Sequence, residues 1–162
     1  MNRETGRNNL EQTKDTTKEI NESAEKRVGD AERVNSILDG INLDGLTSDD
    51  IAALDETKSG YSKDYESVVS QEVVEPTNEV DSKGKEDISG LNESKDQVNT
   101  AREGFEAAAG ISEVGAANAE KASAKMEDSS NQYEQIIEEY SSVIEQAKES
   151  SKNAQSRIES LF

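Results

Sequence analysis

The loop at residues 39–50 has the residue types that come closest to a metal site. The third, fifth and sixth places of a calcium-binding loop are filled by Asn42, Asp44 and Gly45. Its first and twelfth places fall on Gly40 and Ile51, which cannot supply the carboxylates required there. A turn followed by a capped, acidic helix start explains the same residues. We therefore expect no metal site, and a calcium-gated module would show a thermal shift that a chelator reverses.

Catalytic chemistry has little support in this sequence. The chain has no histidine and no cysteine, which removes the commonest general base and every thiolate. Its 36 acidic residues are so numerous that two carboxylates at catalytic spacing carry no information. Serine has no histidine partner, and no P-loop or Gly-x-Gly-x-x-Gly motif is present. We predict a non-enzymatic protein without catalytic residues, cofactor or small-molecule substrate.

The composition favours long helices with a thin core. Hydrophobic residues make up 31% of the 162 residues and charged residues 33%, too little apolar area for a core of ordinary thickness. The formal charge of −18 argues against nucleic acid and anionic membrane surfaces as partners. We see no apolar run that could insert into a membrane and no signal peptide. We expect a protein that is cytoplasmic or exported without a cleaved leader.

The elements that position any functional residue are helices with a seven-residue repeat, clearest from Ile88 to Phe162. One column of this repeat, broken at Ser112, holds Leu91, Val98, Phe105, Ala119, Met126, Tyr133, Tyr140, Ala147, Ala154 and Leu161. A second column holds Ile88, Ala109, Ala116, Ile137, Ile144 and Ile158. Two such columns are typical of a helix that buries a narrow stripe against partner helices. The glycines at 104, 110 and 115 indicate a bend or a new helix near Ser112.

Two further helices precede this segment. After a frayed tail, a weak apolar stripe with helical spacing begins at Asn9 and runs to Leu38. A second helix is expected to start at Ser48, where either Thr47 or Ser48 can serve as the N-cap. Pro76 is expected to end that helix, because the residue before proline is disfavoured in helical geometry. We predict one helical domain, 1–162, with helices at about 9–38, 48–74 and 86–161, a break near 110–115, and a linker at 75–85.

The predicted fold is all-α: three or four long antiparallel helices in a narrow, elongated bundle with coiled-coil-like packing. A self-contained bundle and a bundle completed by another chain produce the same pattern. The four tyrosines are expected on inner faces, as candidates for packing against one another. The residues expected to serve packing or partner contact are Leu38, Gly40, Ile51, Leu54, Tyr61, Tyr65, Tyr133, Ile137, Tyr140 and Ile144. The alanine-rich stretch 107–124 fits either a close helix contact or an exposed helix.

The Leu38-Asp39-Gly40 turn supports a family resemblance. An acidic helical segment of about 35 residues, then Leu-x-Gly, then another helix, resembles the targeting region of LXG-type proteins. With the small helical WXG-type proteins, these belong to bacterial type VII secretion. The resemblance covers about residues 9–75 and implies a cargo-targeting module or a dedicated helical partner. The chain lacks a Trp-x-Gly motif and a Tyr or Phe followed four residues later by an acid.

The leading hypothesis is a helical protein–protein interaction module that pairs with another helical chain or with itself. Its most specific form is a secretion partner or targeting protein of a type VII-like system. The alternative is a structural or scaffold coiled-coil protein that assembles by itself. The mass of the purified chain as a function of concentration separates these two classes.

Overall fold

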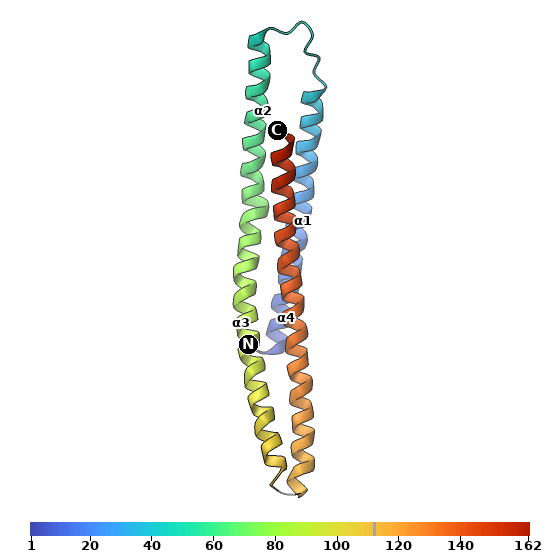
Figure 1. Ribbon diagram of the computed structural model, residues 1–162, viewed down its shortest axis with the longest axis vertical. Helices are drawn as coiled ribbons and strands as arrows, with labels where there is room; N and C mark the ends of the chain where they lie inside the picture. Colours follow the sequence, from blue (N-terminus) through green and yellow to red (C-terminus); the bar gives the residue numbers. More distant parts are fainter. Residues whose placement is uncertain (112) are drawn as a thin grey trace. The chain divides into compact units, whose positions relative to one another are not determined.

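The structure, a computed structural model, describes residues 1–111 and 113–162, with only the backbone of Val114. Most of the described residues are helical and none lies in a strand, which confirms the all-α prediction. The elements are α1 (Arg3–Asp39), α2 (Ser48–Val69), the π-helical turn η1 (Ser70–Val74), α3 (Glu75–Ala109) and α4 (Glu113–Leu161) (Figure 1).

Contacts divide the chain into two compact units. Unit 1 comprises Met1–Lys14 and Ser82–Val143, and unit 2 comprises Asp15–Asp81 and Ile144–Phe162. Each unit therefore contains a segment of α1, a segment of α3 and a segment of α4, and unit 2 also contains α2 and η1. The two units are described separately below.

The start of α1 differs from the prediction, because residues 3–8 are helical and not a frayed tail. The Asn2 side chain caps this end by accepting a hydrogen bond from the Thr5 backbone N–H at 2.8 Å. The terminal amine of Met1 donates to Ser94 Oγ at 2.8 Å, which ties the first turn to α3 within unit 1. Gly6 is buried against Leu91, so the absence of a side chain at residue 6 lets α1 lie close to α3.

The predicted linker at 75–85 is also wrong, because α2, η1 and α3 follow one another without a loop. In a regular α-helix the ring of Pro76 would meet the carbonyl four residues earlier, and the wider π turn just before it relieves that clash. The Glu75 backbone N–H donates to the Ser70 carbonyl, the longer hydrogen bond that defines such a turn. The buried side chains of Val73 and Val80 on either side of the proline hold this segment in the core of unit 2.

The expected break in the C-terminal segment coincides with the end of α3 at Ala109 and the start of α4 at Glu113. The expected helix start and the column interruption at Ser112 lie outside the described residues. Much of the first predicted column is buried, including Leu91, Tyr133 and Tyr140 in unit 1 and Ala147 and Ala154 in unit 2. Phe105 departs from this pattern, because 39% of its surface is exposed.

The core of unit 1 combines apolar and polar side chains. It contains Leu10, Thr13, Asp87, Leu91, Ala119, Ser130, Tyr133, Ile136, Tyr140 and Val143. The core of unit 2 is more uniformly apolar. It contains Thr17, Ile20, Ala24, Val28, Ala31, Val69, Val73, Thr77, Val80, Ile144, Ala147, Ser151, Ala154 and Ile158. These side chains are separated mostly by three or four positions along each helix, the spacing that brings residues onto one face.

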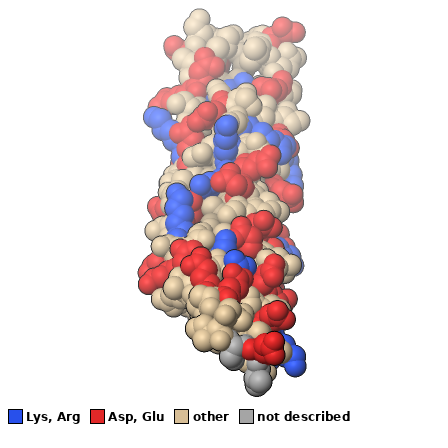
Figure 2. All heavy atoms as spheres, turned by 60° about the horizontal axis from the view of Figure 1, so that its bottom comes forward, with Lys and Arg blue, Asp and Glu red and all other residues tan. Residues whose placement is uncertain are grey.

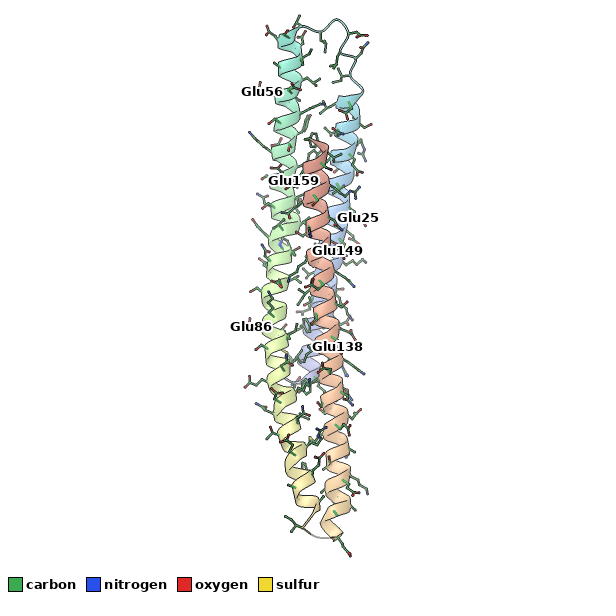
Figure 3. The ribbon with its side chains drawn as sticks, viewed as in Figure 1. Glu25, Glu56, Glu86, Glu138, Glu149 and Glu159 are labelled. Carbon is green, nitrogen blue, oxygen red and sulfur yellow. The ribbon has the colours of Figure 1, made fainter. Side chains whose placement is uncertain are left out.

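Charged side chains cover the outer faces. Acidic groups are spread over the visible surface in Figure 2, with basic groups among them. The exposed glutamates labelled in Figure 3 project outward from their own helices; they are Glu25, Glu56, Glu86, Glu138, Glu149 and Glu159. This distribution leaves the apolar stripe of each helix as the surface available for packing.

Candidate partner-binding site

The structure distributes the predicted packing and partner residues over both units. Tyr133, Ile137 and Tyr140 lie in unit 1, where both tyrosines are buried and Ile137 is half-buried. The others lie in unit 2: Leu38, Gly40, Ile51, Leu54, Tyr61, Tyr65 and Ile144. Ile144 is buried there, whereas Leu38, Leu54 and Tyr65 are half-buried and Gly40 is exposed. The predicted set therefore combines core positions with a surface.

The predicted packing of the tyrosines against one another is wrong. Tyr61 is 39% exposed and Ile51 38% exposed, so neither is enclosed on an inner face. The aromatic partner of Tyr65 is Phe162, with ring centroids 6.1 Å apart and ring planes 11° apart. The physical reason is that α4, which ends at Leu161, does not reach the earlier turns of α2.

A buried polar cluster in unit 1 was missed by the sequence analysis. The hydroxyl of Tyr140 donates to Asp87 Oδ2 at 2.9 Å, and Asn9 Nδ2 lies 3.3 Å from both oxygens of the same carboxylate. Burial, together with the Asp87 carboxylate, raises the pKa of the Tyr140 phenol above its ordinary value of 10.0. The seven-residue spacing of Val73, Val80 and Asp87 is the sequence signal that could have placed this carboxylate on the core face.

This cluster is better suited to aligning helices than to catalysis. Its three hydrogen-bonding side chains come from α1, α3 and α4 of unit 1, and each supplies a group that another requires. A shift of any helix by one turn would leave the Asp87 carboxylate buried without its donors, which is costly. Buried polar groups of this kind select one alignment in helical assemblies.

The end of unit 2 beyond Phe162 is built from two helices. Arg157 near the end of α4 pairs with Glu32 of α1, and Phe162 stacks on Tyr65 of α2. Past these contacts α1 continues to Asp39 and α2 extends back to Ser48, joined by a loop (Figure 1). We call residues 37–61 the hairpin tip. Within unit 2 it is the part of the α1–α2 hairpin that α4 does not cover.

The hairpin tip exposes a group of large apolar side chains. Ile37 is 65% exposed and Leu43 52% exposed, both well beyond the exposure of a packed side chain. The exposed apolar residues of the tip are Ile37, Ile41, Leu43, Leu46, Ile51 and Tyr61. Single exposed apolar side chains are ordinary, but six of them on one end of a hairpin are typical of an interaction surface.

The loop of the hairpin tip has an ordered backbone. Thr47 caps α2 through a reciprocal pair with Asp50: Asp50 N–H donates to Thr47 Oγ1 at 3.2 Å, and Thr47 N–H donates to Asp50 Oδ2 at 2.9 Å. The hydrogen bonds that the Thr47 backbone N–H and the Thr47 hydroxyl donate to the Asp50 carboxylate lower the pKa of that carboxyl. The side chain of Asn42 accepts from the Asp44 N–H at 2.9 Å, and Gly45 has φ of 83°, a left-handed conformation that favours glycine.

The arrangement of this loop fits the turn and helix cap better than a calcium loop. Asn42 and Asp50 direct side-chain oxygens to backbone N–H groups of the loop itself. Across residues 1–111 and 113–162, no group of three or more acidic side chains is placed to hold a metal ion. The chemistry available at the hairpin tip is therefore apolar contact and charge.

The backbone conformation at Gly40 of the Leu-x-Gly motif does not require a glycine. Its φ is not positive, and a Cβ atom there would lie 3.4 Å from the Ser36 carbonyl oxygen and 3.5 Å from that of Ile37. Alanine is therefore nearly accommodated at residue 40. A requirement for glycine at this position would have to come from a partner that approaches closely.

The charge of the hairpin tip is strongly one-sided. Between Arg33 and Lys58 there is no basic residue, and the six acidic ones are Asp39, Asp44, Asp49, Asp50, Asp55 and Glu56. Lys58 pairs with Asp39 at 3.0 Å. In the three-helix part of unit 2, by contrast, acids meet bases on neighbouring helices, as in Arg27–Glu72 at 2.8 Å and Lys148–Asp81 at 2.8 Å. The tip therefore offers an apolar surface with an acidic border.

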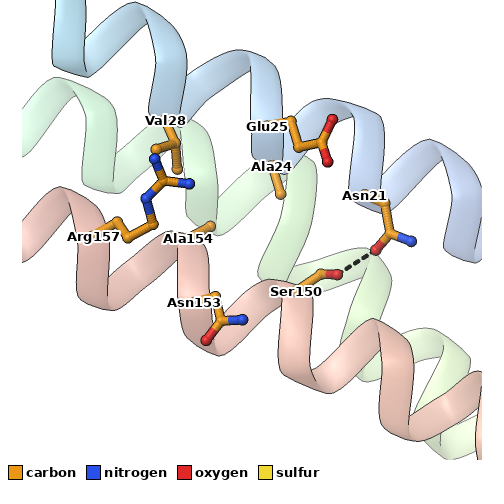
Figure 4. Close-up of a pocket in the computed structure, with 8 residues that line it drawn as sticks. All are labelled: Asn21, Ala24, Glu25, Val28, Ser150, Asn153, Ala154 and Arg157. Carbon is orange, nitrogen blue, oxygen red and sulfur yellow. Dashed lines mark hydrogen bonds between the residues drawn. The ribbon is translucent and has the colours of Figure 1, made fainter.

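Unit 2 also contains a shallow groove between α1 and α4, of about 270 Å³ (Figure 4). Ala24 and Ala154 line it with their small side chains, and the dashed line in the figure marks the hydrogen bond from Ser150 to Asn21. Its border is polar, with Glu25 and Arg157 on opposite helices. The groove contains too little apolar surface to anchor a ligand.

No helix in the described part of the chain is both long and apolar enough to cross a membrane. No protein-family model, no curated protein and no solved structure has significant similarity to this chain.

Proposed function

We propose that this protein is a non-enzymatic helical interaction module that binds a second helical chain at the hairpin tip. The observation that supports the proposal is the group of exposed apolar side chains on a two-helix end that α4 does not cover. A helix laid against two others buries its apolar stripe as α4 does in the rest of unit 2. The partner would thus occupy the place of a third helix.

The charge of the tip indicates the chemistry of that partner. Six acidic residues border the apolar group, and an approaching acidic chain would be repelled. A helix with apolar residues at every third or fourth position and lysine or arginine on its flanks fits both features. Apolar contact would supply most of the affinity, and the charges would speed association and exclude acidic competitors.

The proposal includes coiled-coil-like packing within each unit. In unit 2 the contacts between α1 and α4 join residues 129 apart for Asn21–Ser150 and 125 apart for Glu32–Arg157, a separation that supports a parallel pair. Contacts between α3 and α4 in unit 1 support an antiparallel pair, since Lys95 meets Glu134 and the later Glu106 meets the earlier Ser123. We therefore propose an up-down-up order of helices, in which α1 and α4 share one direction.

A secretion partner or targeting protein of a type VII-like system is the specific form of this proposal. It rests on the Leu38-Asp39-Gly40 motif, which lies at the exposed end of α1 and in the loop that follows. Gly40 is the informative residue, because the fold nearly accommodates alanine there. Expression in a bacterium with a type VII system and in its secretion-deficient mutant tests this form. We expect export that depends on the system and is lost in Gly40→Ala, while helicity is unchanged.

The binding function itself is tested with a defined probe. A labelled synthetic amphipathic helix with lysine flanks is titrated with the full chain, and fluorescence anisotropy measures the affinity. We expect Leu43→Asp and Ile51→Asp to weaken binding by about tenfold or more, since each places a charge in the apolar surface. Ile111→Asp is the matched control, because Ile111 is exposed and apolar but lies in unit 1.

A probe of the same apolar stripe with glutamate flanks tests the charge argument. It should bind more weakly than the lysine probe, and the difference should shrink as salt is added. Equal binding of both probes, or equal loss of binding in Leu43→Asp and Ile111→Asp, would count against the hairpin tip as the binding site.

A further inference from the structure

The hairpin tip contains two Asp-Gly dipeptides, Asp39-Gly40 and Asp44-Gly45. They are the two places in the chain where a glycine follows an aspartate, and no glycine follows an asparagine. At such a dipeptide the backbone nitrogen of the glycine can attack the side-chain carboxyl carbon of the aspartate, because no Cβ atom on the glycine hinders the approach. The reaction also requires that this nitrogen and this carboxyl group are free to meet.

The first dipeptide is restrained by the end of α1. Asp39 is the last residue of that helix, and the Gly40 N–H continues the helical pattern by donating to the Ser36 carbonyl at 3.1 Å. The Asp39 carboxylate accepts hydrogen bonds from Lys58 Nζ at 3.0 Å and from Asn35 Nδ2 at 3.2 Å. Both reacting groups of Asp39-Gly40 are therefore engaged with other residues.

The second dipeptide has neither restraint. Asp44 and Gly45 are exposed, in a turn closed by the hydrogen bond from the Leu46 N–H to the Leu43 carbonyl at 3.2 Å. The backbone N–H of Asp44 donates to Asn42, but within the described residues its carboxylate has no donor or ion-pair partner and the Gly45 N–H has no acceptor. A short exposed turn of this kind opens readily, which lets the two groups meet.

We infer that Asp44 is a modification site, at which the backbone rearranges from aspartate to isoaspartate. The Gly45 nitrogen attacks Cγ of the protonated Asp44 side chain, a C–N bond forms, and the side-chain hydroxyl leaves with the proton of the nitrogen as one water. The product is a five-membered succinimide ring. Hydrolysis then adds one water: cleavage between the nitrogen and Cγ regenerates aspartate, and cleavage between the nitrogen and the main-chain carbonyl carbon yields isoaspartate. Water is the only co-reactant.

The rearrangement changes the shape of the hairpin tip and not its charge. In isoaspartate the main chain passes through Cβ and Cγ of residue 44, which adds one atom between Leu43 and Leu46, and the former main-chain carboxyl becomes the side chain. The turn between the two leucines cannot keep its geometry with this extra atom. Both leucines belong to the exposed apolar residues of the tip, so we expect weaker partner binding. That consequence rests on the proposed function, whereas the modification site does not.

The two dipeptides are expected to react at different rates in the folded chain. At Asp39 the hydrogen bond from the Gly40 N–H and the ion pair with Lys58 must both break before the ring closes. One neutral hydrogen bond and one partly exposed ion pair together slow the reaction by about tenfold. Unfolding removes these restraints, so the two rates should converge in urea.

Peptide mapping of the full chain tests the inference. The folded protein is incubated for several weeks at about pH 6, where a small fraction of exposed aspartates is still protonated. Trypsin then releases residues 34–58 as one peptide, because no basic residue lies between Arg33 and Lys58, and both dipeptides are measured in the same molecule. Electron-transfer fragmentation locates isoaspartate within it. We expect residue 44 to convert about tenfold faster than residue 39 in the folded chain, and at a similar rate in urea.

Two variants serve as controls. Asp44→Glu keeps the charge but would have to close a six-membered ring, which forms more slowly, so conversion at residue 44 should disappear while that at residue 39 stays unchanged. Lys58→Met removes the ion-pair partner of Asp39 and should speed conversion at residue 39 by a few-fold. Equal rates at the two dipeptides of the folded chain, or isoaspartate that forms in urea but not in the folded chain, would overturn the inference.

The consequence for binding is measured on an incubated sample of known isoaspartate content. Its affinity for the lysine-flanked helical probe should be several-fold weaker than that of fresh protein, and incubated Asp44→Glu should bind as its fresh form does. Equal affinity of the two wild-type samples would refute the link between rearrangement and binding. Failure of the fresh protein to bind the probe would count against the proposed function, while the mapped isoaspartate at residue 44 would still establish the modification site.

Discussion

Replacing Tyr140 with phenylalanine removes one hydroxyl from the polar cluster of unit 1 and leaves the ring in place. That hydroxyl donates to the buried Asp87 carboxylate at 2.9 Å. A hydrogen bond to a charged group contributes about 1.5 to 3 kcal/mol, and after its loss the Asp87 carboxylate still accepts from Asn9 Nδ2 at 3.3 Å. We therefore expect Tyr140→Phe to lower the free energy of unfolding by about 1.5 to 3 kcal/mol at pH 7.

The pH dependence of this loss identifies its cause. Burial beside Asp87 raises the pKa of the Tyr140 phenol above 10.0, so the folded chain holds the phenolic proton more tightly than the unfolded chain. The stability that depends on this proton is fully present below pH 10 and decreases as the pH rises above it. Because the variant has no such proton, the difference between wild type and variant should shrink above pH 10 by at most about 1.4 kcal/mol per pH unit.

The assay is urea unfolding, followed by circular dichroism at 222 nm, at several pH values from 7 to 11. Tyr133→Phe is the matched control, because the Tyr133 hydroxyl donates to an uncharged acceptor, the Met1 carbonyl, at 3.3 Å. We expect a loss of about 1 kcal/mol or less for that neutral hydrogen bond. A loss for Tyr140→Phe that equals the control, or that stays constant up to pH 11, would show that the cluster does not hold a proton as argued.

Two further predictions concern packing and charge. Gly6→Ala places a Cβ atom 2.6 Å from Leu91 Cδ2, so we expect thermal unfolding to show a loss of about 1 to 3 kcal/mol. Gly29→Ala is the control, because nothing lies within 4 Å of its Cβ position, and it should stabilise α1 by up to about 1 kcal/mol. A double-mutant cycle on Arg27 and Glu72 should give about 0.2 to 1 kcal/mol, since both side chains are partly exposed. Arg27 lowers the pKa of Glu72 below 4.5, so this contribution is present above that pH and is lost as the pH falls below it.

Much of the helical structure could be predicted from the sequence, because helical periodicity is local information. The column through Tyr133, Tyr140 and Ala147 is buried as expected, and the Thr47 cap lies where the sequence placed it. The errors occur where a neighbouring helix decides the outcome. Residues 3–8 are helical because Met1 and Gly6 contact α3 within unit 1. Pro76 lies within a continuous helical segment because η1 widens the turn before it and the residues around it are buried.

The candidate binding residues divide in the same way. Ile51 and Leu54 were selected for their apolar spacing, which is correct for a helix but does not say whether another helix covers them. Leu43 was not selected, because the loop that contains it has no periodicity, and its exposure became apparent only from the structure. Asp87 was missed because a carboxylate in an acidic chain is unremarkable until its donors are known.

The sequence by itself determined the helical character of this protein, the spacing of its apolar stripes and the excess of acidic groups on the outer faces. These depend on residues within a few turns of one another, and the chain therefore specifies them locally. The tertiary structure decided how far each helix extends past its neighbours, which leaves one end of unit 2 uncovered by α4. That stagger depends on contacts such as Asn9 with Asp87 and Tyr65 with Phe162, between residues far apart in the chain, and no periodic pattern contains them.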